Sequence, residues 1–313
     1  DLTVPEREDT RAALRREIVS AWGTDEVRSR RPTPLDEVRS GLIVFEQSLW
    51  NALPRLLRSV DRALSATTGR GLPLEAAPLS FGSWMGGDRD GNPNVTPQVT
   101  REACLLSRWM AAALYLKEVE ALRDEISIAR ATPELCERTG HAPEPYRALL
   151  RDVRDRLRAT RAWADASLQA GRDLAPPDTV YLDAEALRAP LRLCHDSLMA
   201  EGNAETANGR LLDVLRRLAA FGLTLAPLDI RQDSERHTET LDTITQALGL
   251  GSYAAWDEER RVAFLVAELD NPRPLIPADL VASPDTRDVL DTFAMIATIP
   301  PESLGAYVVT MTH

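Results

Sequence analysis

The segment PLSFGSW, residues 78–84, runs directly into the polar segment MGGDRDGN, residues 85–92. It is short and apolar and is bounded by proline and glycine, which is typical of a buried β-strand. Two further segments share this character, LTLAPLDIR (223–231) and GAYVVTM (305–311). Long helical stretches separate the three segments, and strands separated by helices indicate parallel β/α architecture. The sequence therefore predicts a mainly α chain with a partial β/α barrel, of the TIM type, that carries large helical insertions.

Most of the remaining chain has apolar residues at helical spacing. Ser283 and Pro284 suit the N-cap and first position of one predicted helix, and Ser234 is the candidate N-cap of another. Pro54 is expected to bend the helix that contains it. The predicted helices cover residues 9–29, 34–66, 100–127, 144–171, 182–202, 209–222, 234–250, 257–270 and 283–299.

Composition excludes several classes of function. The 313 residues carry a net charge of −11, from 37 basic and 48 acidic side chains. This charge argues against binding to nucleic acid or to a membrane surface, although a local arginine site remains compatible with an anionic ligand. The sequence contains no apolar run of about 18 residues, so no transmembrane helix is predicted. The cysteines Cys104, Cys136 and Cys194 lack paired spacing, which is typical of reduced thiols in a cytoplasmic protein.

The loop after the first predicted strand is the first candidate site. Active sites of β/α barrels lie at the carboxyl ends of the strands, where this loop would fall. Arg89 is suited to hold a carboxylate or phosphate. The alternative is a structural turn with Arg89 in an ion pair. An EF-hand is excluded because Pro93 and Val99 stand where its glycine and glutamate are required. The polar residues of this loop are Asp88, Arg89, Asp90 and Asn92.

The end of the second predicted strand is the other candidate. Arg231 ends that strand, and its planar guanidinium is suited to bind an anion through two hydrogen bonds. Asp229 and Gln232 are placed to hold Arg231, and Trp84 would form a hydrophobic wall beside the anion. The alternatives are a buried structural ion pair for Arg231 and core packing for Trp84.

These motifs carry a resemblance. SWMGGDRDGNPNVT (83–96) and the segment from LDIRQ to NPRPL (228–275) together resemble the phosphoenolpyruvate carboxylase family. Further segments occur in that family's order, so that the resemblance covers nearly the whole chain. They include residues 20–58, 144–163, 210–222 and 305–311.

The resemblance implies an enzyme that joins bicarbonate to phosphoenolpyruvate, giving oxaloacetate and phosphate in anaplerotic carbon fixation. It implies a cytoplasmic, Mg²⁺-dependent, allosterically regulated homotetramer with a barrel among many helices. By position, Arg231 matches the family's substrate-phosphate arginine, and Trp84 aligns with a tryptophan of the bicarbonate pocket. We therefore expect catalytic roles for Arg231, Arg89, Asp88 and Asp90, and substrate binding by Arg231, Trp84, Asn92 and Gln232.

A third cluster, of three arginines, is a candidate site for a phosphate effector. Arg28, Arg30 and Arg31 lie in a region that the family associates with activation by sugar phosphates. The alternative for these arginines is a solvated surface.

The resemblance also implies that essential parts lie outside residues 1–313. The family's catalytic histidine, in an AHPTE motif, would precede residue 1. Its FHGRGG-type loop and two acidic metal ligands would follow residue 313, so no metal ligand is expected within the chain. The apolar end GAYVVTMTH agrees with this. We expect the chain to be the central portion of one carboxylase domain and to be inactive alone; the alternative is a non-catalytic helical binding or regulatory module derived from the same family.

Overall fold

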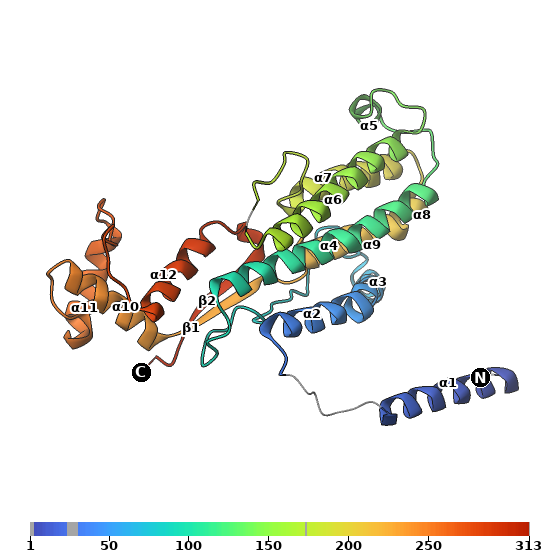
Figure 1. Cartoon of the computed structure of the whole chain (residues 1–313). Coiled ribbons are helices and arrows are strands. Elements are labelled where there is room, and N and C mark those ends of the chain that lie inside the picture. Colours follow the sequence, from blue (N-terminus) through green and yellow to red (C-terminus); the bar gives the residue numbers. More distant parts are fainter. Residues whose placement is uncertain (1–2, 24–30, 173, 313) are drawn as a thin grey trace. The chain divides into compact units, whose positions relative to one another are not determined.

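The computed structural model describes residues 3–23, 31–172 and 174–312 (Figure 1). The chain forms two compact units, Asp1–Thr33 and Pro34–His313. The first unit contains helix α1 (Val4–Gly23), which begins before the predicted position 9 and has no buried residue. Within the described residues, no helix combines the length and apolar character that crossing a membrane requires.

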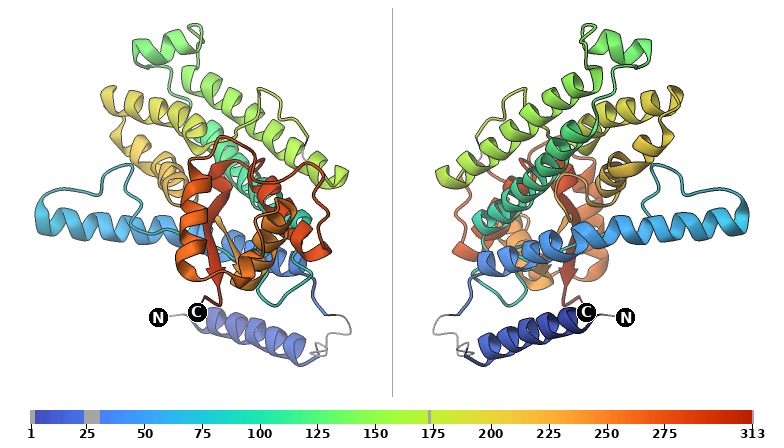
Figure 2. Two further views of the ribbon diagram at one scale, coloured as in Figure 1. Left: turned by 90° about the vertical axis from the view of Figure 1, so that its left-hand side faces the viewer. Right: turned by 90° about the vertical axis from the view of Figure 1, so that its right-hand side faces the viewer.

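The second unit is a helical assembly built on α4. Helices α4 and α6 run side by side in Figures 1 and 2, and α7 packs on α6 and on α9. Their apolar stripes meet in one core, in which Tyr115, Leu157 and Leu191 are fully buried. The helices of this part are α2 (Pro34–Val44), α3 (Trp50–Thr68), α4 (Pro97–Glu125), α5 (Pro133–Arg138), α6 (Pro145–Ala170), α7 (Ala184–Ala200), α8 (Ala204–Thr206) and α9 (Leu212–Phe221).

Two helix junctions contain a π-helical turn. One, Phe45–Leu49, joins α2 to α3, and the other, Ala207–Leu211, joins α8 to α9. Pro54 lies in the second turn of α3 and has no N–H to donate to the carbonyl of Trp50, four residues earlier. Arg217 Nε donates to that carbonyl instead, at 2.8 Å. A buried arginine of α9 thus satisfies the acceptor that Pro54 leaves free, while the bend expected at Pro54 stays a prediction.

A small parallel sheet lies against this helical assembly. Strand β1 (Leu228–Asp233) pairs with β2 (Leu304–Thr310), with an irregularity in register between Leu228 and Ile230. β1 begins later than the predicted strand at 223–231. Leu225 has a left-handed φ of 60°, which is incompatible with a strand. Figure 1 shows both strands between the helices of the second unit.

The strand predicted at residues 78–84 is not formed. Ser83 and Asp88 instead make single parallel bridges to Leu228 and Arg231. Between them, the N–H groups of Gly87 and Asp88 turn back to the carbonyl of Trp84, at 2.9 and 3.1 Å. This turn interrupts the ladder, so the described residues form a two-stranded sheet. Two strands do not establish the predicted partial barrel, which stays a prediction.

The remaining helices follow the two strands. They are α10 (Ser234–Ala247), α11 (Glu258–Leu269) and α12 (Pro284–Ile296), and α10 packs on α12. Ser283 caps α12 through the N–H of Thr286, as predicted. The predicted cap of α10 is wrong. β1 runs on to Asp233, whose carboxylate accepts from the N–H of Glu235 and caps the helix in place of Ser234.

Candidate functional site

The loop after Phe81 is hydrogen-bonded along β1. The N–H of Asp229 donates to the carbonyl of Ser83 at 2.7 Å, and the N–H of Arg231 donates to the carbonyl of Gly87 at 2.9 Å. The N–H of Arg89 donates back to the carbonyl of Arg231 at 2.9 Å. A Cβ on Gly87 would lie 2.1 Å from the carbonyl oxygen of Asp229. Glycine is therefore required for the loop to approach the strand this closely.

Three of the predicted site residues gather on one face of this contact. The Arg231 guanidinium carbon lies 5.0 Å from the centre of the Trp84 ring, and Arg231 Nη1 lies 3.9 Å from Asp88 Oδ2. Arg231 Nε is buried and has no hydrogen-bond acceptor among the described residues. Trp84 keeps 54% of its surface exposed, so the ring forms an open wall beside the guanidinium. This cluster presents a cation whose Nε has no acceptor within the described part of the chain.

Arg89 has a different environment. Only 6% of it is exposed. Its Nη1 donates to the carbonyl of Gly87 at 3.2 Å, and its Nη2 donates to Thr100 Oγ1 at 2.7 Å. Thr100 Oγ1 in turn donates to the carbonyl of Gly86 at 2.7 Å. Burial lowers the pKa of the Arg89 guanidinium. Arg89 and Thr100 therefore fasten the loop to the start of α4.

The other predicted loop residues mainly shape the turn. The N–H of Asp90 donates to Asp88 Oδ1 at 3.2 Å, and the N–H of Asn94 donates to Asn92 Oδ1 at 3.1 Å. Asn92, Arg89 and Gln232 line a cavity of about 410 Å³ that includes neither Arg231 nor Trp84. Consecutive residues of a strand point to opposite faces, which separates Arg231 from Gln232.

The predicted residues thus divide into two groups. Trp84, Asp88 and Arg231 lie together, whereas Arg89, Asn92 and Gln232 line the separate cavity. Asp229 was expected to hold Arg231, but its carboxylate contacts β2 instead. Its Oδ1 accepts from the N–H of Ala306 at 2.9 Å, so that it ties β1 to β2.

The arginine cluster near residue 30 is described only in part. Arg31 is exposed, and Arg28 and Arg30 lie outside the described residues. Arg31 belongs to the first unit, Asp1–Thr33.

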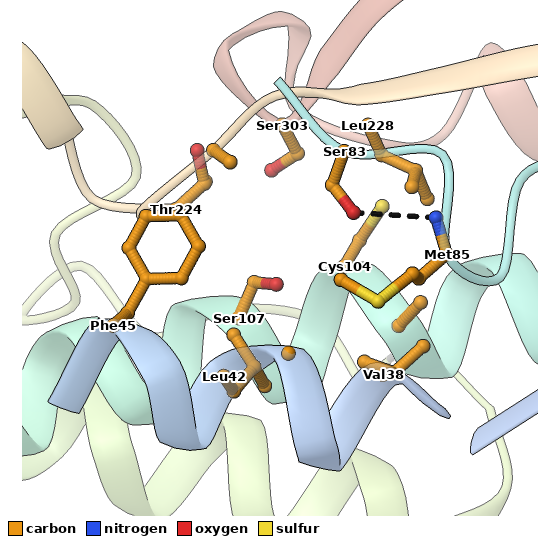
Figure 3. Close-up of a pocket in the computed structure, with 13 residues that line it drawn as sticks. Val38, Leu42, Phe45, Ser83, Met85, Cys104, Ser107, Thr224, Leu228 and Ser303 are labelled. Carbon is orange, nitrogen blue, oxygen red and sulfur yellow. Dashed lines mark hydrogen bonds between the residues drawn. The ribbon is translucent and has the colours of Figure 1, made fainter. Parts of the chain in front are cut away.

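The loop rests on an apolar floor formed by α2 and α4 (Figure 3). The N–H of Met85 donates to Ser83 Oγ at 3.2 Å, and the Met85 side chain occupies the space over Gly41, where a Cβ would lie 2.1 Å from its Cε. A cavity of about 20 Å³ beside Met85 is the size of a single water site. Its hydroxyl groups belong to Ser83, Ser107, Thr224 and Ser303.

Three contributors gave no signal in the sequence. Thr100, Arg236 and Asp288 lie within predicted helices, where a polar residue is expected to face solvent. Thr100 is instead fully buried beneath the loop, and the other two line the cavity beside Arg89. Only the tertiary packing of α4, α10 and α12 brings them to the site.

No metal centre is evident in the described part of the chain. Those residues contain no group of three or more histidine, cysteine, aspartate or glutamate side chains placed to hold a metal ion. The donor set beside Arg231 is one carboxylate and one guanidinium. These residues do not fit a Mg²⁺ site.

Comparisons with known proteins identify relatives along the whole chain. The family model described as phosphoenolpyruvate carboxylase matches residues 1–313. The chain is 54% identical over 311 residues to the phosphoenolpyruvate carboxylase of Ectopseudomonas mendocina (strain ymp), covering 99% of the chain and 35% of that protein. It is 55% identical to the enzyme of Pseudomonas entomophila (strain L48) and 53% identical to that of Pseudomonas putida (strain GB-1), with the same coverage of both chains.

The chain therefore spans about 35% of the length of the curated relatives that it matches. The family predicted from the loop and DIRQ motifs is confirmed by a match over residues 1–313. The chain belongs to the phosphoenolpyruvate carboxylase family.

Proposed function

We propose that this chain contributes the phosphate-binding arginine and one wall of the active site of a phosphoenolpyruvate carboxylase. The observation that supports this most directly is the incomplete hydrogen bonding of the Arg231 guanidinium. Its charge is held between Trp84 and Asp88, yet its Nε lacks an acceptor among the described residues and its nearest carboxylate oxygen lies at 3.9 Å. A buried donor without an acceptor is costly, and the Arg231 side chain keeps 33% of its surface exposed, so a phosphate oxygen would approach the guanidinium from that side.

The reaction proposed for the parent protein joins bicarbonate to phosphoenolpyruvate. Bicarbonate oxygen attacks the phosphorus, the bond to the enol oxygen breaks, and carboxyphosphate and the enolate of pyruvate are formed. Carboxyphosphate then gives CO₂ and phosphate, and the enolate carbon attacks CO₂ to give oxaloacetate. Arg231 would hold the phosphoryl group and neutralise its charge without donating a proton, because guanidinium stays charged at working pH.

Trp84 and Asp88 would act by orienting that arginine. The exposed ring of Trp84 lies against the guanidinium, and Asp88 balances its charge at a distance too long for a hydrogen bond. Arg89 and Asp90 are better supported as residues that shape the loop, since the polar contacts of Arg89 are to Gly87 and Thr100. Gln232 and Asn92 line the other cavity, so direct contact with the same phosphate has no support from the geometry.

Other properties of the parent protein are proposed from family membership. They are residues 1–313 as the central portion of one carboxylase domain, a barrel completed by segments beyond this chain, Mg²⁺ held by ligands outside it, a cytoplasmic location and a homotetrameric assembly. Mg²⁺ would supply charge neutralisation at the phosphoryl group and the enolate. The chain by itself is proposed to be inactive.

The test is Arg231→Lys in the full-length enzyme, with Arg62→Lys on the exposed surface of α3 as the matched control. A lysine retains the charge but offers no planar pair of donors. We expect kcat/KM for phosphoenolpyruvate to fall by about 100-fold, which corresponds to about 2.7 kcal/mol, and Arg62→Lys to behave as the wild type.

Unchanged kinetics in Arg231→Lys would overturn the proposed role. A wild-type reading frame that lacks the histidine and glycine–arginine motifs on either side would instead favour a non-catalytic module of the same family.

A further inference from the structure

The backbone on both sides of Asp88 holds this residue beside Arg231. The N–H of Arg231 donates to the carbonyl of Gly87, and the N–H of Arg89 donates to the carbonyl of Arg231, both at 2.9 Å. These two bonds place Asp88 opposite Arg231 in a parallel bridge. Asp88 Oδ1 also accepts from the N–H of Asp90 at 3.2 Å, which fixes the carboxylate. The negative charge of Asp88 therefore stays next to Arg231 for as long as the loop lies on the strand.

The two charged side chains are close without being hydrogen-bonded. Asp88 Oδ2 lies 3.9 Å from Arg231 Nη1, which is beyond hydrogen-bond distance. The guanidinium therefore gains no acceptor from Asp88. The electrostatic interaction remains, because both side chains keep only 33% of their surface exposed and solvent screens the pair incompletely. Asp88 is thus a counter-charge to Arg231 more than a hydrogen-bonding partner.

An orienting residue and a counter-charge have opposite effects on anion binding. A carboxylate that orients an arginine fixes the plane of the guanidinium through hydrogen bonds, and its loss weakens the binding of an anion. A counter-charge repels an anion that approaches the same guanidinium, and its loss strengthens binding. The contact of Asp88 is too long to fix the plane, whereas the ring of Trp84, 5.0 Å from the guanidinium carbon, lies against that plane.

We propose that Asp88 limits the affinity of Arg231 for phosphate. This role rests on the phosphate site proposed at Arg231 and sets how tightly that site holds its ligand. Each turnover brings in the phosphoryl group of phosphoenolpyruvate and must release inorganic phosphate. Binding both equally tightly would lower KM without raising kcat and would retain the product. A fixed counter-charge beside Arg231 weakens both and favours release of phosphate.

Asp88→Asn in the full-length enzyme tests this role, because the amide removes the charge and keeps the Oδ1 that accepts from the N–H of Asp90. The inhibition constant of inorganic phosphate against phosphoenolpyruvate should fall by about tenfold, and KM for phosphoenolpyruvate should fall with it. Asp88→Glu restores the charge and should return the inhibition constant toward the wild-type value. The control is Asp124→Asn, at an exposed position of α4 about 40 Å along the helix from Pro97, which should match the wild type.

The charge of the anion provides a readout that a change of loop structure would not reproduce. Coulomb energy is proportional to the charge of the ligand, so removal of Asp88 should help a divalent anion twice as much, in free energy, as a monovalent one. Inhibition by sulfate should therefore strengthen by about tenfold in Asp88→Asn and inhibition by nitrate by about threefold. Both gains should shrink as the ionic strength is raised.

An inhibition constant for phosphate that is unchanged in Asp88→Asn would overturn the proposal. A raised constant would also overturn it and would indicate that Asp88 orients Arg231 instead. Equal gains for sulfate and nitrate would exclude a counter-charge. Arg231→Lys separates these outcomes from failure of the underlying site. If phosphate inhibits Arg231→Lys and the wild type equally, phosphate does not bind at Arg231, and the function proposed for that arginine fails together with the role of Asp88.

Discussion

Substitution of Gly87 by alanine tests how the loop is held against β1. The added Cβ would lie 2.1 Å from the carbonyl oxygen of Asp229 and 3.2 Å from Leu228 Cγ. The first contact is with strand backbone, which cannot rotate away as a side chain does. Forcing the methyl group in costs about 1–3 kcal/mol, as overpacking does elsewhere.

The alternative response is that the loop lifts from the strand. The hydrogen bonds from Arg231 N–H to Gly87 and from Arg89 N–H to Arg231 are then lost. At about 0.5–1.5 kcal/mol net for each bond, the loss again amounts to about 1–3 kcal/mol. Both responses therefore predict the same magnitude, and lifting of the loop would also move Asp88 away from Arg231.

The assay is hydrogen–deuterium exchange of peptides that cover residues 83–89 and 228–233. A local destabilisation of about 1–3 kcal/mol raises exchange through opening by about 5- to 150-fold. Gly82→Ala is the matched control, since its Cβ would meet nothing within 4 Å. Exchange in Gly87→Ala that equals the wild type would show that the loop does not depend on glycine at this position, and an equal rise in Gly82→Ala would show that the effect is not specific to the contact with β1.

Three other predictions follow from buried polar groups. Thr100→Val leaves Arg89 Nη2 without its acceptor and should lower the unfolding free energy by about 1–3 kcal/mol, with recovery in Thr100→Ser, measured by denaturant titration. Burial raises the pKa of the Cys194 thiol to about 12. A disulfide reagent at neutral pH should therefore modify the partly exposed Cys136 in the native protein and reach Cys194 only on unfolding. Rapid labelling of Cys194 in the native protein would contradict this. Burial lowers the pKa of His237 below its ordinary value, so the unfolded chain binds a proton that the folded chain resists. The contribution of neutral His237 to the unfolding free energy should be present above about pH 6.5 and decline as the pH falls below that value. The variant His237→Gln should therefore lose unfolding free energy less steeply than the wild type between about pH 7 and 5. Equal slopes for the two proteins would contradict this.

The helical part of the fold was predictable because its signals are local. Pro97, Pro145 and Pro284 open helices close to the predicted starts, and the predicted cap Ser283 is the observed one. The short helix α5 was missed, because six residues carry too little periodicity to be recognised. The turn at Trp84 was missed for another reason. Its glycines permit either a turn or close strand contact, and packing against β1 decides between them.

The division of the candidate site was accessible from the sequence in part. A predicted strand extended by one residue, from 231 to 232, would have placed Arg231 and Gln232 on opposite faces, because consecutive residues of a strand point opposite ways. The inward turn of Arg89 was not accessible. It depends on Thr100, eleven residues further on, and on the approach of α4 beneath the loop. Asp229 looked like a partner for Arg231 but bonds to β2, whose pairing the sequence leaves open.

We propose above that the guanidinium of Arg231, held by Trp84 and Asp88, receives the substrate's phosphate. The structure of the full-length protein with bound phosphoenolpyruvate measures this directly. We expect two phosphate oxygens about 2.7–2.9 Å from Arg231 nitrogens, with the Trp84 ring alongside. A phosphate bound elsewhere, with Arg231 still turned to Asp88, would contradict it.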